Sequence, residues 1–167
     1  MKLHSKNVIN GYLEDKFGYR DDQKPNRSFH LTWSDLPKDA KTLALIFVDY
    51  DAIPVCGFPW IHWACANIDP KLNELPENAS AEMNLLQGVN SRISPFLQGN
   101  KKISKEDAIG FAGCAPPDKT HTYTLYVYAL DTKLNLAKGF YANELIKAIE
   151  GHILAQTKLE MMYKPRK

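Results

Sequence analysis

The sequence predicts a β-rich α+β fold that is mainly β, with a few short helices at the periphery. Two nearly unbroken apolar runs have the length of buried strands, and a C-terminal segment alternates apolar and polar residues with the period of a strand. One segment follows the helical period clearly. The 167 residues, 44% of them hydrophobic, are sized for one domain, 1–167, with its own core.

The first half of the chain contains two predicted strands. Residues 1–30 are polar and interrupted by glycine and proline, which predicts short strands and loops. Residues 43–50 (LALIFVDY) give the strongest strand pattern, an apolar run of the kind that is buried on both faces of a sheet. Residues 61–68 (IHWACANI) are predicted to form another short strand.

The second half begins with a long connection. Residues 70–109 hold three prolines and many Asn, Ser and Lys residues, which predicts a loop with at most short helices. Residues 123–130 (YTLYVYAL) are rich in β-forming side chains and predict a strand. Residues 142–149 predict a helix, which residues 150–154 could still extend, and residues 155–163 alternate as a strand does.

Composition and charge exclude several classes of protein. Lys and Arg number 21 against 19 Asp and Glu, a net charge of +2 without a basic stripe, so no nucleic-acid partner is expected. No apolar run approaches the roughly 18 residues of a membrane span, and residues 1–11 lack the apolar stretch of an export signal. The three cysteines form no Cys-x-x-Cys pair, which indicates free thiols and a cytoplasmic location.

Two carboxylates follow the first strong strand. Because side chains alternate along a strand, the face that carries Leu45 and Phe47 continues into Asp49. If the strand persists, Asp51 points the same way, with the two carboxylates about 7 Å apart. Pro54 then ends the strand, since proline cannot donate to a β ladder. Both aspartates also suit a plain turn at a strand end, so a binding role is one of two readings.

Two histidines and a tyrosine lie at the ends of the other strands. Alternation places His62 on the face opposite Trp63, and His121 on the apolar face that carries Tyr123. Residues 110–118 (GFAGCAPPD) form a stiff loop whose backbone N–H groups can point at an anion. Each feature alone is also explained by core packing or by a turn. Together they suggest a shared pocket at the strand ends.

Several ordered blocks of the chain resemble the phosphatidylethanolamine-binding protein family, specifically its bacterial branch, the Raf kinase inhibitor-like proteins of the YbhB/YbcL type. Residues 28–37 (SFHLTWSDLP) are similar to Ser-Pro-x-Leu-x-Trp-x-x-Val-Pro, and residues 43–54 to the family strand that ends in Asp-Pro-Asp-Ala-Pro. Residues 62–63 match the family's His-Trp pair. Residues 110–117, followed by 121–123 (HTY), resemble Gly-Tyr-x-Gly-x-x-Pro-Pro and His-Arg-Tyr.

The resemblance implies an antiparallel β-sandwich, with a large central sheet and a smaller one, and a small pocket for phosphate or phosphoethanolamine. Carried over residue by residue, the pocket residues are Asp49, Asp51, Pro54, His62, Gly113, Ala115, Pro117, His121 and Tyr123. The backbone N–H of Ala115 is implied as one of the anion donors. Tyr50 stands in place of a family proline and one residue is inserted before Pro54, so the pocket rim departs from the family pattern there.

The expected function is therefore non-enzymatic binding of a small anion or a phospholipid headgroup, with neither a cofactor nor a metal. Imidazole and tyrosine hydroxyl groups supply the donors that a phosphate needs. A larger imidazolium population predicts tighter phosphate binding at pH 6 than at pH 8. The resemblance adds inhibition of a protein kinase or a protease as a regulatory role, and it leaves a homodimer open.

Two alternative functions stay open. A hydrolase could use the Asp/His pocket for general acid–base chemistry, with Cys114 as its nucleophile if His121 lies within reach. Cys114 also suits simple packing, and the chain has no Gly-x-Ser-x-Gly nucleophile motif. A metal site could be built from four side chains of types that suit zinc: Asp49, Asp51, His62 and His121.

Overall fold

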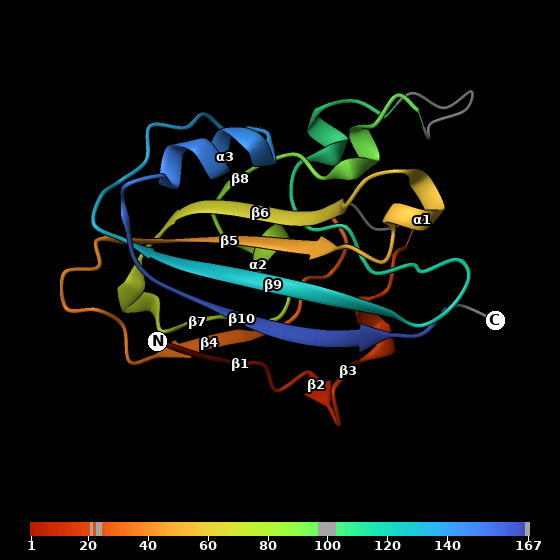
Figure 1. The fold of residues 1–167 in the computed structure, drawn as a ribbon, viewed down its shortest axis with the longest axis horizontal. Helices are drawn as coiled ribbons and strands as arrows, with labels where there is room; N and C mark the ends of the chain where they lie inside the picture. Colours follow the sequence, from red (N-terminus) through yellow and green to blue (C-terminus); the bar gives the residue numbers. More distant parts are fainter. Residues whose placement is uncertain (21, 23–24, 97–102, 166–167) are drawn as a thin grey trace.

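The computed structural model describes residues 1–20, 22, 25–96 and 103–165. In this part of the chain, a seven-stranded sheet lies beside a three-stranded sheet (Figure 1), which confirms the predicted β-rich fold. The strands of the large sheet, in spatial order, are β2 (Val8–Ile9), β3 (Tyr12–Leu13), β10 (Ile153–Tyr163), β9 (His121–Leu130), β5 (Thr42–Asp49), β6 (Trp60–Ile68) and β8 (Leu86–Gln87). Neighbouring strands are antiparallel, except that β3 and β10 pair in parallel.

The small sheet and the helices are short. The small sheet consists of β1 (Lys2–His4), β4 (Leu31–Ser34) and β7 (Glu74–Leu75). The α-helical segments are α1 (Ile53–Cys56), α2 (Ala79–Glu82) and α3 (Ala142–Ile149), and 3-10 turns cover Asp15–Phe17, Pro70–Leu72, Ser91–Ile93 and Glu106–Ala108. No helix in the described ranges has the length and apolar character needed to cross a membrane.

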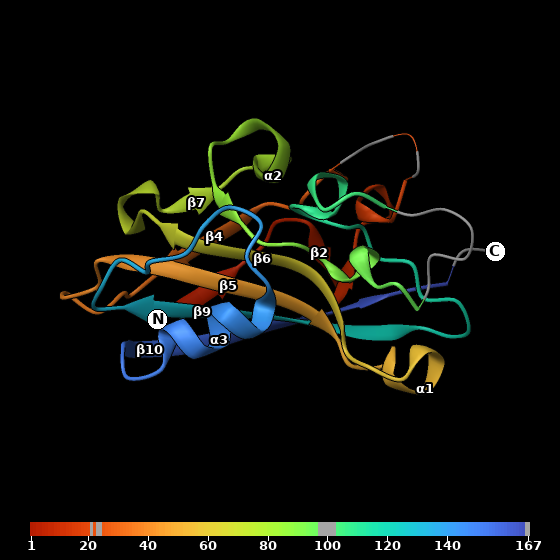
Figure 2. The same cartoon turned by 90° about the horizontal axis from the view of Figure 1, so that it is seen from above.

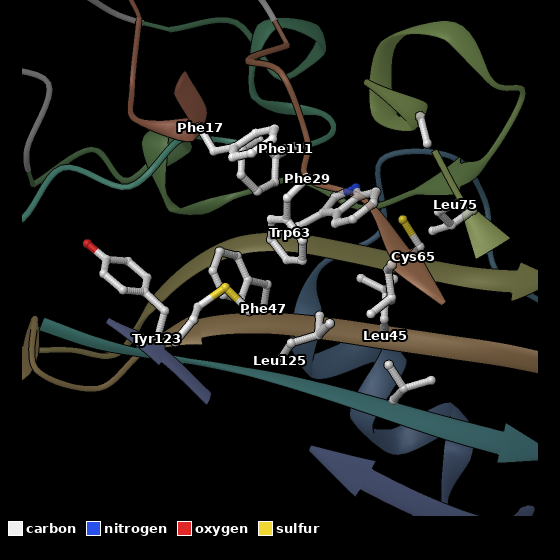
Figure 3. Packing of buried hydrophobic residues seen from close by; sticks show 14 of the residues in the cluster. Phe17, Phe29, Leu45, Phe47, Trp63, Cys65, Leu75, Phe111, Tyr123 and Leu125 are labelled. Atoms are coloured by element: carbon white, nitrogen blue, oxygen red, sulfur yellow. The ribbon is translucent and has the colours of Figure 1, made fainter. Parts of the chain in front are cut away.

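The core has two layers because side chains alternate along β5. Leu45 and Phe47 belong to a cluster between the large and small sheets, whereas Ile46 and Val48 belong to a cluster under α3. Figure 2 shows α3 on one face of the large sheet and β4 and β7 on the other. In the first layer, aromatic rings pack edge to face, as Phe29 does on Phe47 with ring centroids 5.2 Å apart (Figure 3). Both faces of β5 are therefore buried, as its apolar run predicts.

The strands predicted at 43–50, 61–68 and 123–130 are β5, β6 and β9, and the predicted helix at 142–149 is α3. This helix does not continue through residues 150–154. The backbone leaves the helical conformation at Glu150, and Gly151 adopts a left-handed φ of 78°. The chain then turns back into β10 from Ile153, where the alternating pattern pairs with β9.

The connection predicted at 70–109 contains the short helical turns expected there, and also two two-residue strands that the sequence reading missed. These strands, β7 and β8, each extend an edge of a sheet. Segments this short carry no periodic signal, so only their pairing with β4 and β6 defines them. Residues 97–102 of this connection lie outside the described residues.

Candidate functional site

A cavity of about 470 Å³ lies at one end of the large sheet, where β5 ends and β9 begins. Figure 1 shows α1 at this same end. The antiparallel register pairs Asp49, the last residue of β5, with Tyr123, which lies near the start of β9. Seven of the nine sequence-predicted pocket residues line the cavity: Asp49, His62, Gly113, Ala115, Pro117, His121 and Tyr123.

His62 reaches this cavity through a β-bulge in β6. Phe47 pairs with Trp63 but the next residue, Val48, pairs with Ile61, which leaves His62 as an extra residue. The prediction that His62 points away from Trp63 is therefore wrong. The extra residue resets the alternation and turns the imidazole toward the same layer, where its centroid lies 5.7 Å from that of Phe47.

The His62 ring is neutral at physiological pH. Its Nδ1 lies 2.8 Å from the carbonyl oxygen of Ala112 and donates a hydrogen bond to it, which fixes the proton on Nδ1. Burial lowers the pKa of His62 to about 4, because a charged ring would lose its hydration. Nε2 is therefore a hydrogen-bond acceptor, not an imidazolium donor.

His121 has the opposite character, because both of its ring nitrogens face carboxylates. Nδ1 lies 2.7 Å from Asp49 Oδ2, and Nε2 lies 2.8 Å from Asp118 Oδ1. Burial of the ring opposes protonation, but the hydrogen bonds and charges of the two aspartates outweigh it and raise the pKa of His121. The hydrogen bond from His121 in turn lowers the pKa of Asp118. The site thus holds one histidine whose neutral form is favoured, His62, and one whose charged form is favoured, His121.

The Tyr123 hydroxyl is a buried donor. Its oxygen is shielded from solvent and makes no hydrogen bond to any residue that the structure describes. Figure 3 shows this oxygen on the side of the ring away from Phe47. Burial raises the pKa of Tyr123 far above its ordinary value, and the nearby Cys114 and Asp49 raise it further. The hydroxyl therefore keeps its proton, and Ala115 and Pro117 line the cavity with it.

Gly113 allows two loops to approach closely. A Cβ built on this residue would lie 2.3 Å from the carbonyl carbon of Gly18, so only glycine fits. The Tyr19 N–H donates to the carbonyl of Cys114, which ties the loop after the first 3-10 turn to the wall of the cavity. The Gly113 N–H itself donates to Asn26 Oδ1 at 2.8 Å, so its contribution to the site is one of shape.

Asp51 and Pro54 are the two predicted pocket residues that do not line the cavity. The strand ends at Asp49, so the alternation on which the Asp51 prediction relied does not reach it. Its carboxylate accepts the backbone N–H of Thr122 at 2.8 Å and fastens the start of β9. Pro54 lies exposed in α1, while its neighbours Val55 and Cys56 contribute to the cavity wall.

The cavity also contains residues that the sequence reading did not place there: Tyr19, Ala52, Val55, Cys56, Trp60, Arg92, Ile103 and Ala112. Arg92 matters most, because the motif blocks contain no cation. It lies in a 3-10 turn, its side chain is buried, its Nη1 donates to the carbonyl of Asp107, and its guanidinium lies 5.3 Å from the ring centroid of Tyr19. No feature of the polar sequence around Arg92 predicts that its side chain is buried.

The four side chains considered for a metal are occupied in other ways. His62 donates to a carbonyl, Asp51 accepts a backbone amide, and Asp49 and His121 bind each other. Across the described parts of the chain, no group of three or more His, Cys, Asp or Glu side chains is arranged to hold a metal ion.

The fold and this site define a class of protein: a two-sheet β protein with a mainly apolar cavity at one end of its larger sheet, into which a few polar side chains point. The model of the phosphatidylethanolamine-binding protein family matches residues 4–164, and the chain belongs to this family. It is 49% identical over 162 residues to the uncharacterized protein YxkA of Bacillus subtilis (strain 168), covering 92% of this chain and 94% of the relative. It is also 35% identical over 139 residues to a UPF0098 protein of Methanothermobacter thermautotrophicus, covering 83% of each chain.

Solved structures show the same fold. A putative phosphatidylethanolamine-binding protein homolog, CT736 from Chlamydia trachomatis, superposes with a TM-score of 0.79 at 31% identity, covering 98% of this chain and 97% of the other. YbcL of E. coli, described as a member of the mammalian PEBP family, gives a TM-score of 0.79 at 24% identity, with 99% and 98% of the two chains covered. The second similarity is one of fold.

Proposed function

We propose that the cavity binds a small tetrahedral oxyanion, either inorganic phosphate or the phosphate of a phospholipid headgroup such as phosphoethanolamine. The observation that carries this proposal is the buried Tyr123 hydroxyl, which lines the cavity and makes no hydrogen bond within the described residues. Buried polar groups are nearly always paired, and an unpaired one costs free energy. A phosphate oxygen in the cavity supplies the acceptor that this hydroxyl lacks.

Charge supports the same ligand class. Arg92 lines the cavity, and His121, whose charged form is favoured by its two carboxylate partners, adds a second positive group beside Asp49. The negative charge of Asp49 is largely neutralised by His121, so this carboxylate does not exclude an anion. Guanidinium and imidazolium N–H groups make the short, charge-assisted hydrogen bonds that phosphates favour.

The neutral His62 fits a protonated or ammonium-bearing ligand as well. With its proton on Nδ1, this ring offers an acceptor nitrogen at neutral pH. A phosphate hydroxyl or an ethanolamine ammonium can donate to such a nitrogen. Phosphoethanolamine therefore has a complement for both of its charged ends in one cavity.

The test is a calorimetric titration of inorganic phosphate and of phosphoethanolamine into the wild-type protein and the Tyr123→Phe variant. Loss of one hydrogen bond to a charged ligand is expected to weaken phosphate binding by roughly tenfold or more. The fold of the variant should be at least as stable, because the deleted hydroxyl is unpaired. Tyr128→Phe is the matched control, since Tyr128 is on the opposite face of the same strand and packs near α3. Equal phosphate affinity in all three proteins would count against the proposal.

We propose a binding function without catalysis. Cys114, the nucleophile of the hydrolase alternative, is fully buried, and burial together with the charge of Asp49 raises the pKa of its thiol. A thiol of this kind is a poor nucleophile at neutral pH. Turnover of a phosphoester, an ester or a peptide that disappears in both His62→Ala and His121→Ala would establish the hydrolase instead.

Two further proposals follow from the family and the cysteines. Inhibition of a protein kinase or a protease would use the exposed apolar side chains of Ile53 and Val55 beside the cavity. Inhibition assays with the purified protein and an Ile53→Ser/Val55→Ser double variant test this role. A cytoplasmic location is proposed because all three cysteines are free thiols, as a reducing compartment maintains them.

A further inference from the structure

The two carboxylates that bind His121 are unlike each other. Asp49 is buried at the end of β5, where its other oxygen also accepts the backbone N–H of Ala52 at 3.2 Å. Asp118 follows Pro117 in an exposed loop, and its side chain is 49% exposed. The first carboxylate is fixed by the sheet, whereas the second holds the ring from the solvent side. Ion pairs with one such exposed partner are weak and exchange readily with solvent.

Both hydrogen bonds exist only when the ring is charged. A neutral imidazole has one N–H and can donate to one carboxylate, whereas an imidazolium donates to two. The donor that His121 would offer to a ligand is Nε2–H, because Nδ1–H is committed to the buried Asp49. In this structure Asp118 Oδ1 occupies that donor at 2.8 Å.

The charge of the site changes with the position of Asp118. The cavity wall carries two positive groups, Arg92 and His121, and one negative group, Asp49. Among the described residues that line the cavity this leaves one net positive charge, which the Asp118 carboxylate, bound to His121, offsets. Asp118 thus supplies the negative charge and the acceptor oxygen that a bound anion would supply.

We propose that Asp118 is a built-in competitor of the ligand: its carboxylate caps His121 Nε2, and a phosphate oxygen binds by displacing it. This inference rests on the proposed function and adds a rule of selectivity. A simple carboxylate such as acetate only replaces one carboxylate contact by another, so it gains little. A phosphate gains because it also reaches Tyr123 and Arg92 from the same cavity.

The experiment measures inorganic phosphate binding at pH 7 by calorimetry in the wild-type protein, Asp118→Ala and Asp118→Asn. Removal of the competing carboxylate is expected to tighten phosphate binding about three- to fivefold in Asp118→Ala. Asp118→Asn, which keeps an acceptor oxygen without the charge, should fall between the other two. The matched control is Asp131→Asn, which breaks a surface contact of similar length, 2.9 Å, between Asp131 and His152.

Acetate provides a second readout. In Asp118→Ala, acetate should compete with phosphate, because it can occupy the contact that the deleted carboxylate made, whereas in the wild type it should not compete. If the wild type binds phosphate and Asp118→Ala binds it equally or more weakly, the competing role of Asp118 is refuted but the proposed anion site is not. If neither protein binds phosphate, the proposed function fails as well. A gain in phosphate affinity of the same size in Asp131→Asn would show a general effect of removing a negative charge, and it would also refute the competing role of Asp118.

Discussion

The neutral state of His62 makes the fold sensitive to acid in a way that one substitution can isolate. The pKa of this ring is lowered by burial to about 4, from an ordinary value of 6.5. In the unfolded chain the ring takes up a proton as the pH falls below 6.5, whereas in the fold it stays neutral until near pH 4. Protons therefore favour the unfolded chain across this window, and the stability contributed at neutral pH is lost as the pH falls through it.

The size of the effect follows from the two pKa values. At pH 5 the unfolded ring is almost fully protonated and the folded ring almost fully neutral, which lowers the free energy of unfolding by about 2 kcal/mol relative to pH 8. Below pH 4 the loss approaches about 3 kcal/mol. The pKa of His121 is raised, so its effect on stability has the opposite sign to that of His62. The stability that His121 contributes is present at low pH and is lost as the pH rises through its pKa in the folded protein.

The assay is urea unfolding at pH 8 and at pH 5 for the wild type and His62→Asn, whose side-chain amide can still donate to the Ala112 carbonyl. The variant should be less stable at pH 8, but its decline toward pH 5 should be smaller than that of the wild type by about 2 kcal/mol. His152→Asn is the control, because that ring is half-exposed and makes only a surface contact with Asp131. Equal declines in the wild type and His62→Asn would refute the reasoning, as would an NMR titration that finds a pKa near 6.5 for His62.

Three further predictions concern the cavity. Sulfate, whose charge does not change near neutral pH, should bind more weakly once the pH rises above the raised pKa of His121. Calorimetry over a pH series from pH 6 upward measures this trend, and a sulfate affinity that stays constant or increases would show that His121 is not the donor. Gly113→Ala should lower the free energy of unfolding by more than about 2 kcal/mol, measured by urea unfolding, because its Cβ would lie 2.3 Å from Gly18; an unchanged midpoint would contradict this clash. Arg92→Gln should weaken phosphate binding by about tenfold in the same titration, whereas unchanged affinity would place the anion elsewhere.

The parts of the site that follow regular strands could be predicted from the sequence. The face of Leu45 and Phe47 leads into Asp49, and His121 shares its face with Tyr123, as alternation requires. The antiparallel pairing of β5 and β9 then brings these polar groups to one end of the sheet. Period and burial alone predict the positions of Asp49, His121 and Tyr123, because the pairing of the two strands contains no irregularity there.

The errors occur where the backbone departs from a regular strand. The bulge in β6 adds His62 between two paired residues, and nothing in IHWACANI distinguishes an extra residue from a regular one. Asp51 lies in the turn that follows β5, so it binds the Thr122 amide and not the cavity. Arg92 is 73 positions from Tyr19 in the chain, and only the long-range folding of the loops brings both residues to the same cavity.

If the cavity binds an anion as we propose, its affinity should depend on two residues outside the strands. Asp49 and His121 lie in the first layer of the core and nearly cancel each other's charge, so this pair orients a donor but adds little net attraction. Among the described lining residues the remaining positive charge is that of Arg92, and on our proposal the Asp118 carboxylate offsets it until a ligand displaces that carboxylate. Two chains that share every strand residue of the site, but differ at positions 92 and 118, should consequently differ in phosphate affinity while keeping the same fold.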